Sequence, residues 1–243
     1  MKIVFFGTPE FAVASLKALY ESGHEIVSVV TVPDRTGGRG NKLIESDVKK
    51  FALEKGLPIL QPEKLRDPMF VDRLIDLNAD LFVVIAFRML PEIVWSIPPL
   101  GTFNLHASLL PQLRGAAPIN HAIISGFKKT GVTTFFINEE IDKGEILLSA
   151  ETCISDDDDA ESLHDRLMHL GADLVIETIR GLENETLHPS PQPRSDLFTP
   201  APKIFKPDCK IDFANHATTV DRFIIGLSPY PGAWYNLILD DGR

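Results

Sequence analysis

The sequence predicts an α/β fold in which a doubly wound, mainly parallel sheet is covered by helices on both faces. Short apolar runs alternate with amphipathic segments through residue 105, which is the order of a strand and helix repeat. Several of these runs are apolar at every position, as strands are when helices cover both faces of their sheet. After residue 130 the spacing shortens, and this change predicts an antiparallel extension of the sheet.

The first half of the chain shows the alternation most clearly. Residues 2–6 form a short apolar run that ends at Gly7, and residues 11–20 follow with helical spacing of their apolar side chains until Gly23. The same two patterns predict strands at 26–32, 81–86 and 103–105 and helices at 46–55 and 67–77. Helical segments between the strands are what parallel crossovers require.

The segment after residue 130 follows a different pattern. Strands are predicted at 132–137 and 146–150, and the eight residues between them are too few for a helical crossover, so the two strands should pair antiparallel with Asp142 in their connecting loop. A long helix should then run to Gly181. Four aspartates, 156–159, precede it, and a negatively charged helix N-terminus explains them better than a cation site does.

Proline content divides the rest of the chain. Residues 184–208 contain six of the 18 prolines, which predicts an extended, semi-rigid linker between a first domain at 1–183 and a second at 209–243. In the second domain we expect strands at 210–213 and from Trp234, with a helix at 219–227. Asp241-Gly242 is a hairpin signal with no strand after it, so this domain is expected to be incomplete.

Composition narrows the function classes. The 243 residues, 44% of them hydrophobic, are enough for one substantial core and a smaller appendage. Two cysteines give no disulfide framework, the first residues lack the order of a signal peptide, and no apolar run approaches the roughly 20 residues that span a bilayer. We therefore expect a cytoplasmic protein with no membrane role.

Charge is distributed unevenly. A net charge of −10 argues against a strongly basic nucleic-acid face. Residues 34–41 differ from the rest, because three glycines alternate there with Arg35 and Arg39 and are followed by Lys42. This stretch is either a solvated surface loop or a mobile segment that becomes ordered on phosphate.

Three residues could carry chemistry. Asn104 and His106 lie two apart at a strand end, so their side chains should point the same way, and Asp142 could reach them from the antiparallel loop. An amide, an imidazole and a carboxylate can stabilise an oxyanion, move a proton and orient the base. The alternative is a polar strand edge with satisfied hydrogen bonds. His164 and His169 miss the usual metal-ligand spacing of i, i+4, and no metal is assigned.

Four motifs together resemble the methionyl-tRNA formyltransferases, within the 10-formyltetrahydrofolate-dependent formyltransferase family. They are residues 5–12 (FFGTPEFA), 38–43 (GRGNKL), 104–111 (NLHASLLP) and 114–119 (RGAAPI). The resemblance covers essentially the whole chain. The motif at 104–111 and the distant aspartate would be shared with all formyltransferases of this family, whereas the other three narrow the match to the tRNA enzyme or its sugar-nucleotide relatives.

The resemblance implies a Rossmann-like catalytic domain, a linker and an OB-like barrel that helps to hold initiator methionyl-tRNA, with 10-formyltetrahydrofolate as formyl donor. It implies no metal and no obligate protein partner. The catalytic residues it implies are Asn104, His106 and Asp142. The folate-binding residues are Ser108, Leu109, Leu110, Pro111, Phe87, Arg88, Met89 and Leu90. The tRNA-binding residues are Arg35, Arg39, Lys42 and Lys203.

This chain departs from the family pattern at two places. The family commonly has Tyr-Gly where this chain has Phe87-Arg88, and the residues after Pro-Ile are Asn120-His121, to which no role is assigned. Two other function classes stay open. One is a formyltransferase for a small amine, such as an amino-sugar nucleotide or glycinamide ribonucleotide. The other is a folate- or RNA-binding module without catalysis.

Overall fold

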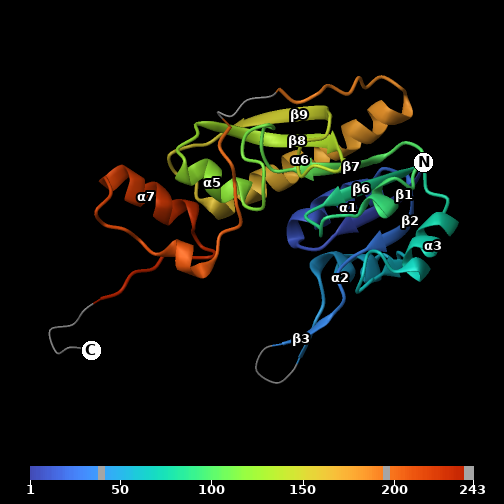
Figure 1. Ribbon diagram of the computed structural model, residues 1–243, viewed down its shortest axis with the longest axis horizontal. Coiled ribbons are helices and arrows are strands. Elements are labelled where there is room, and N and C mark those ends of the chain that lie inside the picture. Colours follow the sequence, from blue (N-terminus) through green and yellow to red (C-terminus); the bar gives the residue numbers. More distant parts are fainter. Residues whose placement is uncertain (38–41, 194–197, 238–243) are drawn as a thin grey trace.

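A seven-stranded sheet forms the centre of the molecule (Figure 1). The computed structural model describes residues 1–37, 42–193 and 198–237. The strands are β1 (Lys2–Gly7), β2 (Glu25–Val30), β5 (Ile59–Leu60), β6 (Leu81–Ile85), β7 (Thr102–His106), β8 (Lys129–Phe136) and β9 (Ile146–Cys153). Their order is β5-β2-β1-β6-β7-β8-β9, and pairing is parallel from β5 to β7 and antiparallel from β7 to β9. The predicted mainly parallel sheet and its antiparallel extension are both confirmed.

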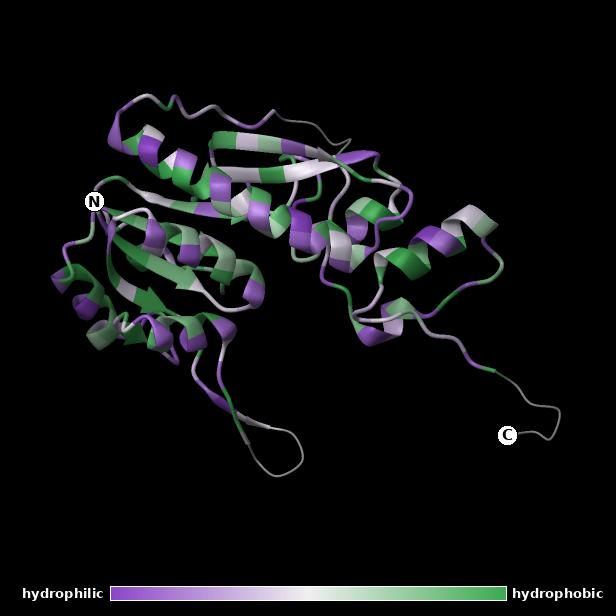
Figure 2. Ribbon diagram, turned by 180° about the vertical axis from the view of Figure 1, so that it is seen from behind, coloured by the Kyte–Doolittle hydropathy of each residue, from purple (hydrophilic) through white to green (hydrophobic). Residues whose placement is uncertain are grey.

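Helices cover both faces, as a doubly wound sheet requires. They are α1 (Glu10–Glu21), α2 (Asp47–Glu54), α3 (Pro68–Asp76), α4 (Glu92–Trp95), α5 (Pro118–Ile124), α6 (Ala160–Glu183) and α7 (Ala217–Gly226), with a 3-10 turn at η1 (Lys206–Cys209). Alternate strand residues separate the two cores: Phe5 and Val83 pack with α1 and α6, whereas Phe6 and Phe82 pack with α3 and α4. Figure 2 accordingly shows mainly hydrophobic residues along the central strands, whereas hydrophobic and hydrophilic residues alternate along the helices. Among the described residues, no helix has both the length and the apolar character to cross a bilayer.

The basic stretch predicted as a loop has paired flanks. β3 (Arg35–Gly37) and β4 (Lys42–Ile44) form an antiparallel hairpin that projects from the body in Figure 1, and residues 38–41 lie outside the described part of the chain. Lys49 anchors the base of the hairpin by pairing with Asp34 and, at 2.8 Å, with Glu45. The Lys49 ammonium, followed by the Gln61 amide, lowers the pKa of Asp34.

Helix α6 begins at the aspartate run. Asp159 is its N-cap and forms a capping box with Ser162, which confirms the charged N-terminus predicted from the sequence. The helix ends two residues beyond Gly181, where the sequence predicted its end. A side chain at Gly181 would collide with Leu187. This glycine therefore does not end the helix; it leaves room for the chain that follows the helix to pack against it.

Backbone hydrogen bonds hold the proline-rich segment at two places against the part of the chain that forms the sheet. The backbones of Ser190 and Ile146 exchange hydrogen bonds of 2.8 and 2.9 Å at the edge of β9. Farther on, Ala201 donates to the carbonyl of Arg114 at 2.8 Å, and Leu113 donates to that of Thr199 at 2.8 Å. Residues 186–193 and 198–205 of the segment contain no helix, and residues 199–201 lie beside residues 113–117.

The described part of the C-terminal region contains the predicted helix, but a single bridge stands in place of the two predicted strands. Lys210 and Trp234 form an isolated parallel bridge, and residues 209–237 contain no barrel strand. One such contact leaves both segments without further strand partners, so neither becomes an extended strand. Helix α7 packs on α5, where the Asn120 amide donates to the carbonyl of Gly226 at 2.8 Å.

Candidate active site

A cavity of about 1030 Å³ opens at the carboxyl ends of β1, β6 and β7. In open α/β sheets this edge is where ligands bind. Asn104, His106 and Asp142 all line the cavity. The three residues selected from the sequence are therefore brought together on one surface.

His106 is oriented by its Nε2 atom. The imidazole is 6% exposed, and Nε2 lies 2.9 Å from the carbonyl oxygen of Leu113. Because a carbonyl only accepts, Nε2 carries the hydrogen, and in the neutral ring Nδ1 keeps its lone pair. Nδ1 lies 3.9 Å from Asp142 Oδ2, within ion-pair distance and too far for a direct hydrogen bond.

Asn104 lies two residues before His106 on the same face of β7. Its backbone pairs with Val84 on one side and with Phe135 on the other, so the strand itself is rigidly placed. Among the described residues its side-chain amide has no recorded hydrogen-bond partner, and the residue lines the cavity. The amide is therefore available to a bound molecule.

Asp142 stands in a tightly constrained loop. Its φ of 54° lies in the left-handed region, which is uncommon for a residue other than glycine. Asp142 Oδ2 accepts a hydrogen bond of 2.9 Å from the Gly115 amide, and a side chain at Gly115, whose φ is 128°, would collide with the carbonyl of Ala201. A side chain at Gly144 would likewise collide with the carbonyl of Phe136.

Two further side chains support this loop. Arg114 Nε donates to the carbonyl of Asp142 at 3.1 Å. Gln192 Nε2 donates to the carbonyls of Asp142 at 2.9 Å and Gly144 at 2.8 Å, and its Oε1 accepts from Arg114 Nη2 at 2.6 Å and Nε at 3.2 Å. Nothing in the sequence pattern assigned a role to Gln192.

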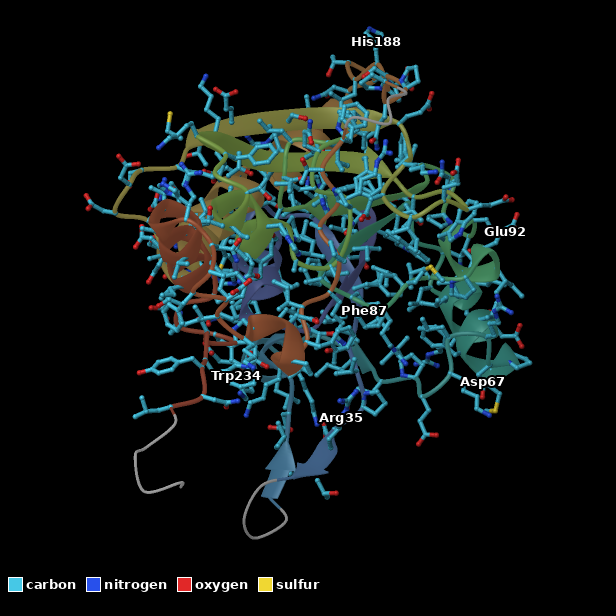
Figure 3. All side chains as sticks on the ribbon, turned by 60° about the vertical axis from the view of Figure 1, so that its left-hand side comes forward. Arg35, Asp67, Phe87, Glu92, His188 and Trp234 are labelled. Carbon is cyan, nitrogen blue, oxygen red and sulfur yellow. The ribbon has the colours of Figure 1, made fainter. Side chains whose placement is uncertain are left out.

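The segment after β6 forms another wall of the cavity. Ala86 has a φ of 46°, and the four residues that follow it line the cavity: Phe87, Arg88, Met89 and Leu90. The Arg88 guanidinium donates to the carbonyls of Pro62 at 2.7 Å and Glu63 at 3.0 Å. Burial, together with the positive charge of Arg35, lowers the pKa of Arg88. Figure 3 shows Phe87 in the body of the molecule and Arg35 on the projecting hairpin.

The segment 108–111 lies behind the cavity wall. Ser108 is fully buried, its hydroxyl donates to the carbonyl of Gln112 at 2.6 Å, and the amide of Leu110 donates to the Thr133 hydroxyl at 3.2 Å. Leu109 and Pro111 continue this turn, and none of the four residues lines the cavity. The turn instead fixes the course of residues 112–115, which carry the carbonyl that holds His106.

The residues assigned to tRNA occupy different places. Lys203 lines the cavity, and its ammonium lies 5.3 Å from the centre of the Phe205 ring. Arg35 is exposed on β3, outside the cavity. Lys42 belongs to β4, although its side chain is not among those described, and Arg39 falls outside the described residues.

Several residues that line the cavity had been given no role from the sequence, and three of them are Phe11, Asn120 and His164. Phe11 and His164 pack edge to face with ring centres 5.3 Å apart, and Asn120 lines the same cavity. Phe11 belongs to the motif at 5–12 and Asn120 directly follows the motif at 114–119, so both could have been indicated by the sequence, whereas His164 lies in an ordinary amphipathic helix. The described residues contain no group of three or more side chains suited to hold a metal ion.

Comparison with known proteins assigns the family. The formyl transferase profile matches residues 1–179, and the profile of the formyl transferase C-terminal domain matches residues 203–242. The methionyl-tRNA formyltransferase of Bacteroides thetaiotaomicron is 52% identical over 246 residues, which cover 100% of this chain and 76% of that protein. The enzyme of the same name from Flavobacterium psychrophilum is 52% identical over 97% of this chain and 75% of its own length.

Solved structures show the same fold at low identity. An N-formyltransferase from Helicobacter canadensis, in complex with folinic acid and dTDP-3-aminofucose, has a TM-score of 0.72 at 19% identity and covers 93% of this chain and 80% of its own. HypX from Aquifex aeolicus in complex with tetrahydrofolic acid has a TM-score of 0.71 at 19% identity, over 98% of this chain and 36% of its own. With the profile matches and the close relatives, this chain belongs to the formyl transferase family, in the branch of the methionyl-tRNA formyltransferases.

Proposed function

We propose that this protein transfers the formyl group of 10-formyltetrahydrofolate to the free amino group of initiator methionyl-tRNA, which gives N-formylmethionyl-tRNA for translation initiation. The observation that carries the proposal is the meeting of Asn104, His106 and Asp142 on one cavity, in a chain about half identical to methionyl-tRNA formyltransferases over its full length. No metal enters the chemistry proposed for these residues.

Asn104 and His106 act on the formyl oxygen. An amine that attacks the formyl carbon places negative charge on that oxygen, and the Asn104 amide, which has no recorded hydrogen-bond partner among the described residues, is available to donate to it. His106 Nδ1, once protonated, is a second donor on the same strand face, because Nε2 is already committed to Leu113. Each preorganised donor of this kind contributes about 2.7–4 kcal/mol to transition-state stabilisation.

Asp142 manages the positive charge and the proton. Its carboxylate lies 3.9 Å from His106 Nδ1, where it attracts the imidazolium and leaves the proton free for transfer. The attacking amine must lose a proton as the new bond to carbon forms, and Asp142 takes it through His106 or through water. When the oxyanion collapses, the carbonyl re-forms, the bond between the formyl carbon and the folate nitrogen breaks, and that nitrogen takes up the proton that Asp142 received, so that tetrahydrofolate leaves neutral.

The two substrates have separate walls in this proposal. Phe87, Arg88, Met89 and Leu90 bind the pterin end of the folate, and residues 108–111 support the folate site from behind. The acceptor end of the tRNA enters beside Lys203. Arg35 on β3 and Lys42 on β4, together with Arg39 between them in the sequence, contact its phosphates. The hairpin and the C-terminal region extend toward the same side of the body in Figures 1 and 2, which supports a shared tRNA surface.

In this proposal the chain has three functional regions. Residues 1–183 form the catalytic part, 184–208 the linker, and 209–243 contribute to tRNA binding. A translation enzyme acting on free tRNA belongs in the cytoplasm, and no membrane or obligate protein partner is needed for the reaction.

The test is tetrahydrofolate release from 10-formyltetrahydrofolate with three acceptors in parallel: charged initiator tRNA, an amino-sugar nucleotide and glycinamide ribonucleotide. We expect turnover with methionyl-tRNA alone. Turnover with a small amine alone would move the protein to the small-amine formyltransferases. Absence of turnover with all three acceptors would contradict the proposed activity.

A further inference from the structure

The side chain of Gln192 forms hydrogen bonds with the loop that carries Asp142. No feature of the sequence indicates these contacts. It lies between Pro191 and Pro193, in the segment that joins the regions matched by the two family profiles. Its amide nitrogen donates to the backbone carbonyls of Asp142 and Gly144, and its amide oxygen accepts twice from Arg114. All the hydrogen-bonding capacity of the carboxamide is directed to this loop and to the residue that also supports it.

We propose that Gln192 is a positioning residue that holds Asp142 in its catalytic place and, with Arg114, links the proline-rich segment to the active site. The inference rests on the function proposed above and assigns Gln192 no contact with substrate. It acts on the backbone of Asp142, whose left-handed φ of 54° needs support from its surroundings. When the loop is held, Asp142 Oδ2 stays 2.9 Å from the Gly115 amide and 3.9 Å from His106.

The arrangement is selective for an amide. Two backbone carbonyls face Nε2, so a carboxylate at this position would meet two acceptors where donors are needed. Conversely, Oε1 faces the Arg114 guanidinium, so the orientation of the carboxamide is fixed from both ends. Gln192→Glu therefore keeps the size and the Arg114 contact while it disrupts the contacts with the loop.

The first experiment compares Gln192→Ala and Gln192→Glu with Ser190→Ala, a matched control. Ser190 is exposed in the same segment, and only its backbone pairs with Ile146. We expect both Gln192 variants to lower kcat about 10- to 100-fold with little change in KM for either substrate, since a small misplacement of a catalytic group has effects of this size. Ser190→Ala should retain the wild-type kcat.

A double-mutant comparison separates positioning from general destabilisation. In an Asp142→Asn background, measured by labelled-formyl incorporation at high enzyme concentration, Gln192→Ala should cause little further loss, because residues that act as a unit are non-additive. An equal loss in both backgrounds would overturn the proposal. If Gln192→Ala keeps the wild-type kcat while Asp142→Asn is inactive, the proposed role of Gln192 is overturned and the proposed function of the protein still stands. Full activity of Asp142→Asn would instead contradict the catalytic role of Asp142.

Hydrogen exchange of the Gly115 amide gives a readout that needs no turnover. This amide donates to Asp142 Oδ2, so it should exchange faster in Gln192→Ala and at the wild-type rate in Ser190→Ala. Unchanged exchange in Gln192→Ala would show that Asp142 stays in place without the glutamine and would overturn the proposal.

Discussion

His106 is the residue at which the chemistry can be tested most directly. Its ring is buried and held through Nε2, so His106→Ala removes a preorganised donor without disturbing the segment 86–91 that forms the proposed pterin wall. We expect turnover to fall about 100-fold or more while folate affinity is retained. Trp95 lines the same cavity, so quenching of its fluorescence reports folate binding. Unchanged turnover would contradict the assignment, and an equal loss of folate binding would indicate a structural role.

Candidate site residues could be predicted from the sequence where their spacing along a strand, or the pairing of neighbouring strands, indicates where their side chains lie. Asn104 and His106 could be found because they lie two apart on a strand, and Asp142 because the adjacent strands pair antiparallel. Gln192 could not be found in this way. Its partners are backbone carbonyls in a loop 48 and 50 positions earlier, and nothing in a proline-rich segment indicates where that segment will pack.

Among the elements, α6 depends on the electrostatics of its N-terminus. Asp158 is 6% exposed; it accepts hydrogen bonds from the Ser155 amide at 2.7 Å and the Ser162 hydroxyl at 2.9 Å, and it pairs with Arg166. Burial opposes its charge, but these hydrogen bonds and the Arg166 guanidinium outweigh burial and lower its pKa. The stability that Asp158 contributes is therefore present above the ordinary pKa of aspartate and is lost as pH falls through the lowered value.

Asp158→Asn should accordingly reduce the free energy of unfolding at neutral pH by about 2 kcal/mol, because charged hydrogen bonds are lost. The difference from wild type should shrink as the medium becomes acidic. Denaturant unfolding followed by circular dichroism at several pH values measures both effects. Asp157→Asn, on the exposed neighbour, is the control. A deficit that stays constant into acid would show that the carboxylate charge is not responsible.

The elements themselves were predicted where local patterning decides them. The apolar strands and amphipathic helices that were predicted in residues 1–183 are present, because burial on both faces of a sheet determines their sequence, whereas the short elements β5, α4 and α5 were not predicted. The hairpin flanks 35–37 and 42–44 were missed, because each has only three residues, which is too short for the alternating apolar pattern that indicates a strand. Within the described residues, the segments 210–213 and 234–237 form a single bridge and no strand, because strand formation depends on partners that a local pattern does not specify.

The whole molecule brings the hairpin, the cavity and the C-terminal region into one assembly, and Arg35 is suited to test its use of tRNA. Arg35 is exposed, has no recorded acidic partner among the described residues, and lies close enough to Arg88 to lower the pKa of that group. Arg35→Ala should therefore raise KM for methionyl-tRNA and reduce the slope of log KM against log salt concentration by about 1, as expected for one lost phosphate contact. Folate binding and kcat at saturating tRNA should be unchanged, because Arg35 is not part of the cavity lining.

Arg180→Ala is the charge-matched control, since the end of α6 lies beside Met1, at the opposite edge of the sheet from the cavity. If the salt slope of Arg35→Ala equals that of wild type, the hairpin does not contact the phosphates. If Arg180→Ala changes the slope as much as Arg35→Ala does, net charge alone sets the affinity for tRNA.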